Sequence, residues 1–252
     1  YDTDTGMLTL QTGFMAFQET FRGGVEITAA DVAGDSTKEI IVAPASDGGP
    51  NIRVYQYDST EQTWSLLDWF WAYQQSYRGG VELTTLDMNN DGMAEIITTP
   101  KNGSTNVRVY TYDSTEAAFT LLDWFWAYDA DFRGGVDLDK ANIDGSNYHQ
   151  LVAIPQHDGG PNVRVYKYNT ASGEIELLDW VMAYHEAFRG QVDVTAADLT
   201  GDGSSEIITA PLTMGGPNVR IHNYTDGNLE AQYGFMAYAD SFRGGVRVIP
   251  GY

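Results

Sequence analysis

The sequence predicts an all-β protein made of repeated four-stranded units, and three observations carry this prediction. Strings of the type RGGV place their arginines at intervals of 54 to 56 residues, at Arg22, Arg78, Arg133, Arg189 and Arg243. A string of the type PNIRVY occurs once in each interval, beginning at residues 50, 105, 161 and 217. An aromatic string such as WFWAY precedes each RGG-like string. Self-similarity at one period is the signature of a repeat architecture.

Each repeat reads as four short strands separated by turns. In the first repeat we expect them from Val25 to Ala30, Glu39 to Ala43, Asn51 to Tyr57 and Ser65 to Trp71. The first strand follows the glycines, and the second is an apolar run that ends at a proline. The third and fourth are rich in the β-branched and aromatic residues that favour strands. Turn-forming clusters such as AGDS, DGGP and YDST separate the strands, and no stretch has convincing helical periodicity.

Four short strands in about 55 residues predict a β-propeller blade, which buries its faces only against neighbouring blades. We expect residues 1–252 to form one domain whose units start near residues 22, 78, 133, 189 and 243. Four units are complete, while residues 7–17 supply a lone fourth-type strand and residues 246–249 a lone first-type strand. A five-bladed ring, a four-bladed ring, completion by a neighbouring chain and a fragment of a longer array all remain open. Unpaired strand edges invite pairing with another chain, so we expect self-association.

The composition is strongly acidic. The chain has 14 basic and 35 acidic residues and a formal net charge of −21. This charge argues against nucleic acid and anionic membranes as partners, because both attract Lys and Arg. It fits either adaptation to high salt or calcium-binding loops. The absence of cysteine excludes disulfides and cysteine-based zinc sites, and no apolar run is long enough to predict a membrane-spanning helix.

The loop after the first strand of the second unit predicts a calcium site. Asp87, Asn89 and Asp91 stand at positions one, three and five of this loop, and Glu95 stands at position nine. Gly92 permits the bend between them. Hard oxygen ligands at alternate positions of a tight loop are what Ca²⁺ prefers.

The other units carry versions of this loop. The fourth unit repeats the pattern closely, with Asp198, Thr200, Asp202 and Glu206. The first unit keeps a weaker set, which consists of Asp31, Asp35 and Glu39. The third unit has Gln150 at position nine and too little charge for tight binding. Asp and Gly are also good turn formers, so a purely structural role for these loops remains an alternative.

The strings DMNNDGMAEI at 87–96 and DLTGDGSSEI at 198–207 resemble FG-GAP repeats, also called VCBS-like repeats. The surrounding FRGGV and GGPNVRVY strings are similar to the same family, and the resemblance covers nearly the whole chain. It implies a β-propeller, like those of integrin α heads and fungal lectins, with calcium bound between the first two strands of a blade. It also implies a secreted or cell-surface location. It does not fix the function, because the fold hosts lectins, adhesins and accessory domains of enzymes.

Two tryptophan-rich strings are candidate sugar-binding elements, since aromatic faces stack on sugar rings. Strand alternation predicts that every second member packs between units while the others face solvent or a partner. The candidates are Trp64, Trp69, Trp71, Trp124 and Trp126.

Recurrent arginines and the histidines complete the set of residues that stand out. The arginines of the third strands are Arg53, Arg108, Arg164 and Arg220, and we expect structural ion pairs with Asp68, Asp123 and Asp179. The four histidines occupy unlike places in the repeat without metal-ligand spacing, so we expect them on the surface or in loops.

The sequence favours binding over catalysis. It contains no GxSxG elbow, phosphate-binding loop or cluster of histidine and carboxylate residues. Catalysis needs unlike groups at one spot, whereas the polar residues here repeat one another. We therefore expect a non-catalytic adhesion or self-assembling surface module, whose partner is a copy of itself or another surface protein. The alternative is a lectin that binds glycans at repeated sites between blades.

Overall fold

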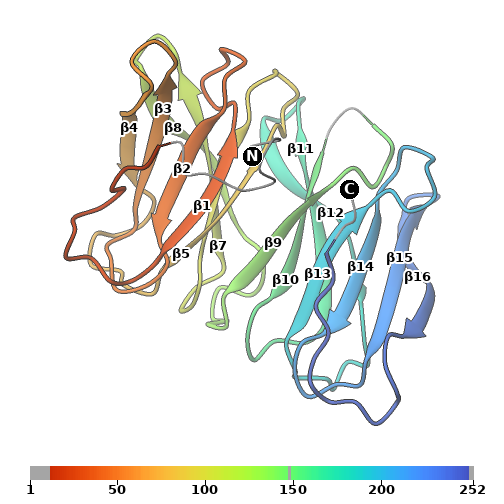
Figure 1. The fold of residues 1–252 in the computed structure, drawn as a ribbon. Coiled ribbons are helices and arrows are strands. Elements are labelled where there is room, and N and C mark those ends of the chain that lie inside the picture. The colour runs from red at the N-terminus through yellow and green to blue at the C-terminus, as the bar shows by residue number, and fades with distance from the viewer. Residues whose placement is uncertain (1–11, 147–148, 250–252) are drawn as a thin grey trace, which may run out of the picture.

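The computed structural model describes residues 12–146 and 149–249. These residues form sixteen strands in four antiparallel sheets of four strands each, and they contain no helix (Figure 1). No helix among them could therefore span a bilayer. The predictions of an all-β fold and of four strands in each repeat are confirmed.

Each repeat forms one sheet. The first sheet contains β1 (Val25–Ala30), β2 (Glu39–Pro44), β3 (Asn51–Asp58) and β4 (Thr63–Trp71). The second contains β5 (Val81–Leu86), β6 (Glu95–Pro100), β7 (Asn106–Asp113) and β8 (Ala118–Trp126). The third contains β9 (Val136–Ala141), β10 (Gln150–Pro155), β11 (Asn162–Asn169) and β12 (Glu174–Met182). The fourth contains β13 (Val192–Ala197), β14 (Glu206–Pro211), β15 (Asn218–Thr225) and β16 (Asn228–Met236).

The strands of every sheet follow one another in chain order, so each sheet is a meander. The pairing of the third and fourth strands is interrupted by a β-bulge at the same place in all four sheets. The bulges follow Val54, Val109, Val165 and Ile221. A bulge adds one residue to a strand and changes the direction of the neighbouring side chains.

The four sheets stand in a row, in sequence order. Contacts join β1 to β5, β5 to β9 and β9 to β13, so the first strands of successive sheets lie beside one another. Figure 1 shows the first and fourth sheets at opposite ends of this row. Among the described residues, no comparably extensive contact joins these two end sheets. The row is therefore open over the part of the chain that the structure describes.

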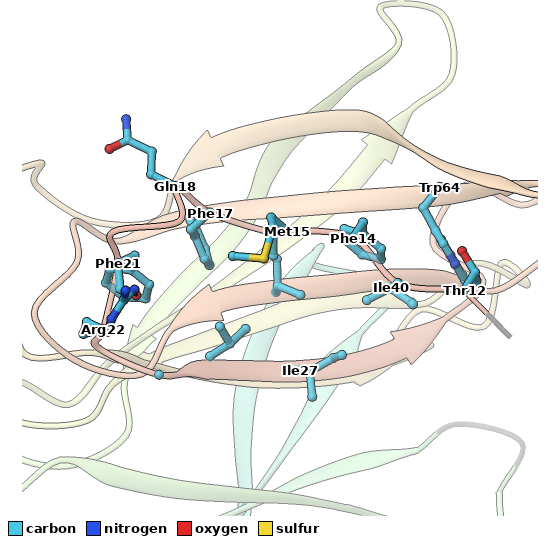
Figure 2. A pocket seen from close by; sticks show the side chains of 15 residues that line it. Thr12, Phe14, Met15, Phe17, Gln18, Phe21, Arg22, Ile27, Ile40 and Trp64 are labelled. Carbon is cyan, nitrogen blue, oxygen red and sulfur yellow. The ribbon is translucent and has the colours of Figure 1, made fainter. Parts of the chain in front are cut away.

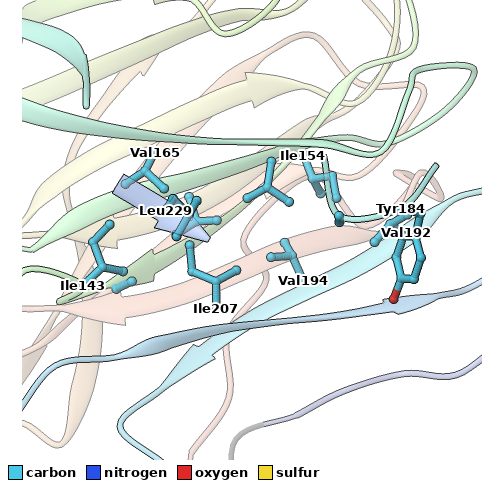
Figure 3. Close-up of a cluster of buried hydrophobic side chains, with 12 residues drawn as sticks. Ile143, Ile154, Val165, Tyr184, Val192, Val194, Ile207 and Leu229 are labelled. Carbon is cyan, nitrogen blue, oxygen red and sulfur yellow. The ribbon is translucent and has the colours of Figure 1, made fainter. Parts of the chain in front are cut away.

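The hydrophobic core of the described residues consists of four clusters, three of them between successive sheets and a small fourth one between the last sheet and residues 246–248. Between the third and fourth sheets, Ile154 and Val165 meet Val194 and Ile207 (Figure 3). Burying one such side chain contributes roughly 1.5–3 kcal/mol. Because the three larger clusters each draw on two sheets, no sheet in the row buries its faces alone.

The two chain ends differ from the lone strands that the sequence predicts. Residues 12–17 lie along the first sheet without forming a regular strand, and residues 7–11 fall outside the described residues. Residues 246–249 are also not a regular strand, which corrects the prediction. The Val246 N–H bonds the Pro211 carbonyl at 2.9 Å, and the Val248 N–H bonds the Asp193 carboxylate at 2.6 Å. Only the first of these two bonds joins two backbone groups, so residues 246–249 do not form a regular β-ladder with the fourth sheet.

Candidate functional site

One recurrent contact couples each sheet to the segment before it. Arg108 on β7 donates from Nη1 to the Ala72 carbonyl at 2.7 Å, and its guanidinium lies 4.9 Å from the centroid of the Tyr73 ring. The Tyr110 hydroxyl donates to the same carbonyl at 2.9 Å. The Phe70 ring packs on Tyr110 with centroids 4.3 Å apart. We call this arrangement of arginine, alanine carbonyl and aromatic ring the arginine clip. A cation over an aromatic ring contributes about 0.5–2 kcal/mol.

The arginine clip is present in all four sheets. In every copy the Nη1–O distance is 2.7 or 2.8 Å, and the guanidinium lies 4.6 to 4.9 Å from the ring centroid. The other three copies join Arg53 to Ala16 and Phe17, Arg164 to Ala127 and Tyr128, and Arg220 to Ala183 and Tyr184. Residues 16 and 17 precede β1, so they hold the place of a preceding sheet.

The predicted pairing of these arginines with recurrent aspartates is wrong. Asp68 accepts the Phe119 N–H at 2.9 Å, and Asp123 accepts the Ile175 N–H at 2.7 Å. Both aspartates thus bind the backbone of the following sheet, whereas the arginines bind the preceding one. Each aspartate pairs with the residue that follows the arginine, so strand alternation sends the two side chains to opposite faces of the sheet. Both residue types therefore have a structural role, as expected, but with backbone partners in neighbouring segments and not with each other.

The loop between β5 and β6 holds the first predicted calcium set. Asp87 Oδ2 accepts the Gly92 N–H at 3.0 Å, and Asn89 Oδ1 accepts the Asp91 N–H at 2.9 Å. The Asn89 amide donates to Asp91 Oδ2 at 2.9 Å and to Glu95 Oε1 at 3.2 Å. Gly92 has a φ of +91°, as the bend requires. The four predicted ligands therefore meet in one turn.

Glu95 is the residue of this loop whose pKa is shifted most. Its side chain is fully buried, and its Oε2 accepts the Met88 N–H at 2.8 Å. Burial, with further contributions from Asp91 and Asp87, raises the pKa of Glu95 to about 7. A buried carboxyl beside two other carboxylates is a donor set of hard oxygens that suits Ca²⁺. Within the described residues, however, no three His, Cys, Asp or Glu side chains converge as a closed metal cage. The chemical fit rests on the loop oxygens and on Glu95.

The loop between β13 and β14 repeats this geometry in part. Asp198 accepts the Gly201 N–H at 2.7 Å and the Gly203 N–H at 2.9 Å. These backbone hydrogen bonds lower the pKa of Asp198, and the bond from Gly203 has the largest effect. Asp202 accepts the Ser204 N–H at 2.8 Å. This turn also contains Thr200, and the buried Glu206 accepts the Leu199 N–H at 2.7 Å.

The loop of the first sheet keeps the backbone arrangement with fewer oxygens. Asp31 accepts the Gly34 N–H at 2.7 Å, and Asp35 accepts the Thr37 N–H at 2.8 Å. Glu39 is buried, and burial raises its pKa. The set is the weaker one that the sequence predicts, because an alanine stands at the third position.

The loop of the third sheet uses an amide where the others have a carboxylate. Gln150 Oε1 accepts the Ile143 N–H at 2.8 Å, and Gln150 Nε2 donates to Asp144 at 3.0 Å. Neutral Gln150 thus accepts the backbone N–H that Glu39, Glu95 and Glu206 accept in the other loops. Its amide also donates to Asp144, the one carboxylate of this loop. This loop satisfies its carboxylate from within the protein.

The candidate tryptophans lie on the outer strands, β4 and β8. Trp69, Trp71, Trp124 and Trp126 are 49%, 38%, 52% and 42% exposed. The intervening phenylalanines pack against the next sheet, as the alternation predicts. Trp64 lies at the end of the row, where its ring centroid is 5.8 Å from that of Phe14.

Two equivalent grooves lie beside the arginine clips. The larger, of about 580 Å³, is lined by Tyr73, Tyr77, Trp124 and Trp126, together with Arg108. The second, of about 390 Å³, is lined by the corresponding side chains one repeat later: Tyr128, Phe132, Arg164, Trp180 and Met182. In the fourth sheet the residue opposite the clip arginine is Gly234, so the tryptophan wall is missing there.

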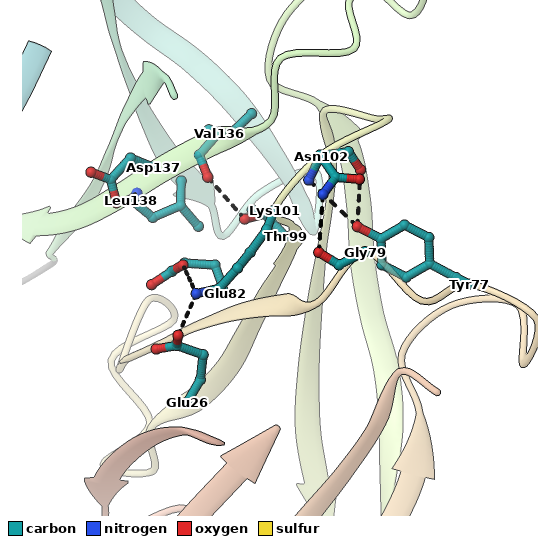
Figure 4. A network of polar contacts seen from close by, with 10 residues as sticks. All are labelled: Glu26, Tyr77, Gly79, Glu82, Thr99, Lys101, Asn102, Val136, Asp137 and Leu138. Carbon is teal, nitrogen blue, oxygen red and sulfur yellow. Dashed lines mark hydrogen bonds and ion pairs between the residues drawn. The ribbon is translucent and has the colours of Figure 1, made fainter. Parts of the chain in front are cut away.

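The first strands carry an acidic residue at their second position in every sheet: Glu26, Glu82, Asp137 and Asp193. Lys101 forms ion pairs with Glu26 and, at 3.3 Å, with Glu82 (Figure 4). Burial raises the pKa of Asp137 to about 6, and the charges of Glu82 and Asp193 act in the same direction. The acidic residues along the first strands therefore repel one another across the sheets.

His222 is fully buried, which corrects its predicted surface or loop position. It occupies the place of Tyr110 and Tyr166 in the other sheets, directly after the bulge. Its Nε2 lies 3.2 Å from the Thr209 hydroxyl, while Nδ1 is buried without a partner among the described residues. Burial, and then the charge of Arg220, lower the pKa of His222 to about 4.

Sequence reasoning did not find the arginine clip, although a signal for it exists. Each clip arginine follows its alanine by 36 or 37 residues, and the alanine always stands before an aromatic residue. A fixed spacing between two repeated strings predicts that they meet, but it does not name the acceptor, which here is a backbone carbonyl.

Neither a scan against models of protein families nor a search of the curated proteins finds a match for this chain.

Proposed function

We propose that this chain is a non-catalytic, self-assembling module of the cell surface or extracellular space. Its four sheets act as β-propeller blades, and its acidic loops bind calcium. We also propose that its repeats belong to the FG-GAP type that the sequence resembles. Copies of the chain are the partners, and the contact surface is the pair of sheet faces at the ends of the row.

The observation that carries the proposal is an apolar sheet face at each end of the row. At the first end, Val25 is 45% exposed and Ile27 is 65% exposed. The residues that correspond to Val25 in the other sheets, Val81, Val136 and Val192, are all buried. Figure 2 shows the groove of about 610 Å³ on this face, lined by side chains such as Phe14, Ile27, Ile40 and Trp64.

At the other end of the row, Phe235 is 55% exposed and Tyr238 is 58% exposed. Tyr128 and Tyr184, which correspond to Tyr238, are 8% and 9% exposed. Extended apolar faces on a soluble domain mark interaction sites. A repeat buries its faces only against another repeat, so a second copy is the natural cover for both ends.

Calcium supports this assembly in two ways. Binding at the loops that begin at Asp87 and Asp198 would stabilise the folded chain by mass action. It would also offset part of the net charge of −21, which makes copies repel one another. Salt screens the same repulsion.

Light scattering at increasing salt, with calcium and with a chelator, tests the proposal. We expect the mean mass to rise with protein concentration, and to rise further with salt or calcium. A monomeric mass under all these conditions would overturn self-assembly.

A second candidate function is glycan binding in the two aromatic grooves. It is favoured by the exposed tryptophan pair of the second sheet, whose rings are perpendicular with centroids 6.5 Å apart, beside the polar side chains of Arg108 and Asn106. Binding to a glycan array, and its loss in Trp124→Ala, would support this function. Leu177→Ala, at a comparably exposed position outside these linings, is the control. Equal binding by the wild type and both variants would remove the grooves from consideration.

A further inference from the structure

The segment before the first sheet reproduces the contacts that a complete preceding sheet makes inside the row. The Phe14 and Tyr55 rings have centroids 4.5 Å apart, and the corresponding pair of Phe70 and Tyr110 is 4.3 Å apart. The Ala16 carbonyl accepts Arg53 Nη1 at 2.7 Å and the Tyr55 hydroxyl at 2.9 Å. These distances equal those at the Ala72 carbonyl. Residues 14–17 therefore occupy a receiving site built for the end of a fourth strand.

The same residue string recurs at the far end of the chain, where none of the residues that the structure describes forms a clip with it. Residues 13–17 read GFMAF, and residues 234–238 read GFMAY. Both are followed by three variable residues and FRGGV. All four clip arginines are already engaged within the chain, so Phe235 and Tyr238 project from the last sheet as a fifth, exposed copy of the segment that the clip binds.

We infer that a second copy of this chain docks head to tail, with Phe235–Tyr238 of one copy seated on Arg53 and Tyr55 of the next in place of residues 14–17. This inference rests on the proposed self-assembly and specifies its contact. The FRGGV string leads into β1 at one end and into residues 246–249 at the other, so β1 of the second copy takes the place of residues 246–249 beside the last sheet. Each displaced hydrogen bond is remade by an equivalent residue.

The exchange is favourable because it buries the apolar side chains of the two end faces that residues 14–17 and 246–249 leave exposed. A five-residue segment covers only part of the first sheet, which leaves Val25 and Ile27 exposed. A complete fourth sheet covers them, as the first sheet covers Val81 and the third covers Val192 within the row. The segment attached to its own chain competes at a high effective concentration, so the exchange requires concentrated protein. The contact is heterologous, because two different faces meet.

Two substitutions on the full chain, at exposed positions where the fold tolerates charge, test this contact. Ile27→Lys places a charge on the receiving face, and Phe235→Lys places one on the docking face. Each variant alone is expected to self-associate at least about 100-fold more weakly than the wild type, because docking would bury an unpaired charge. An equimolar mixture of the two is expected to form a heterodimer and nothing larger, because one intact face of each kind remains.

Sedimentation velocity measures these masses, and Leu177→Lys is the control for an exposed leucine away from both end faces. Melting curves that match the wild type show that the variants fold. If a variant fails this check, Ile27→Ser and Phe235→Ser replace it. If the wild type assembles while either variant alone assembles equally well, or while the mixture stays monomeric, the head-to-tail contact is wrong and self-assembly stands. If the wild type itself stays monomeric, both fail.

Discussion

Replacing His222 by tyrosine should stabilise the contact between the third and fourth sheets, most strongly in acid. In the third sheet the equivalent Tyr166 donates its hydroxyl to the Ala127 carbonyl at 2.6 Å. His222 leaves Nδ1 buried without a partner among the described residues, and only Arg220 reaches the corresponding Ala183 carbonyl. Restoring one hydrogen bond between the sheets is worth about 1 kcal/mol at neutral pH.

The additional effect in acid follows from the pKa of His222, which is about 4 in the folded chain against 6.5 for an ordinary histidine. A lowered histidine pKa means that the unfolded chain takes up the proton first. Neutral His222 therefore makes its full contribution to folding stability at pH values above its pKa in the unfolded chain, and this contribution is lost as the pH falls from about 6.5 towards 4. At a pH of about 5 the loss amounts to roughly 2 kcal/mol. His222→Tyr should therefore gain about 1 kcal/mol at pH 8 and about 3 kcal/mol at pH 5.

Urea unfolding of the wild type and the variant at these two pH values measures the difference. The reverse change, Tyr166→His, is the matched control, and it should introduce a new loss of stability in acid at the contact of the second and third sheets. If His222→Tyr and the wild type lose equal stability between pH 8 and pH 5, His222 is not the acid-sensitive group and the reasoning is refuted.

Three further predictions test separate parts of the account. In thermal melts, Asp91→Ala should reduce the stabilisation by calcium more than Asp144→Ala, because the second loop offers the carboxylates of Asp87, Asp91 and Glu95 and the third loop offers only that of Asp144; an equal response of both variants would contradict this. Asp137→Asn should stabilise the chain by up to about 2–3 kcal/mol at pH 8 and by little at pH 4, because a raised carboxyl pKa favours the folded state in acid and costs stability as the pH rises through 6. Urea unfolding at both values checks this, and a gain independent of pH would show that charge is not the cause. Tyr110→Phe should cost about 1 kcal/mol in the same assay by removing the hydroxyl bond to Ala72, and a neutral change would remove that bond from the clip's energetics.

The strands could be predicted from the sequence because local and repeated signals agree. The apolar run from Glu39 ends at Pro44, where the structure also ends β2. Val25–Ala30 is a strand with the predicted bounds. The relation between sheets was harder, because nothing local in the sequence states that the Arg108 side chain faces the preceding sheet while Asp123 faces the following one. That difference depends on the register of β7 and β8, which pairs Asp123 with Val109 and not with Arg108.

The candidate sites divide in the same way. The Asp87 loop is local, so residue spacing alone predicts that its side chains meet. The burial of His222 depends on a contact between sheets, which the residue type alone does not predict. Its alignment with Tyr110 and Tyr166 in the repeat is the one sequence feature that indicates a buried position. The ends of the chain are not strands because no described strand pairs with residues 12–17, which the Arg53 side chain holds in place, and because residues 246–248 bind partly through the Asp193 side chain.

The central claim, that this chain assembles with itself, is tested most directly by sedimentation velocity of the intact protein over a wide concentration range. At about 1 M salt, where the screening length is only about 3 Å, repulsion between acidic surfaces is largely removed. The account predicts a sedimentation coefficient that rises with concentration, and rises more steeply with calcium than with chelator. A single monomeric boundary at every concentration, with and without calcium, would contradict it.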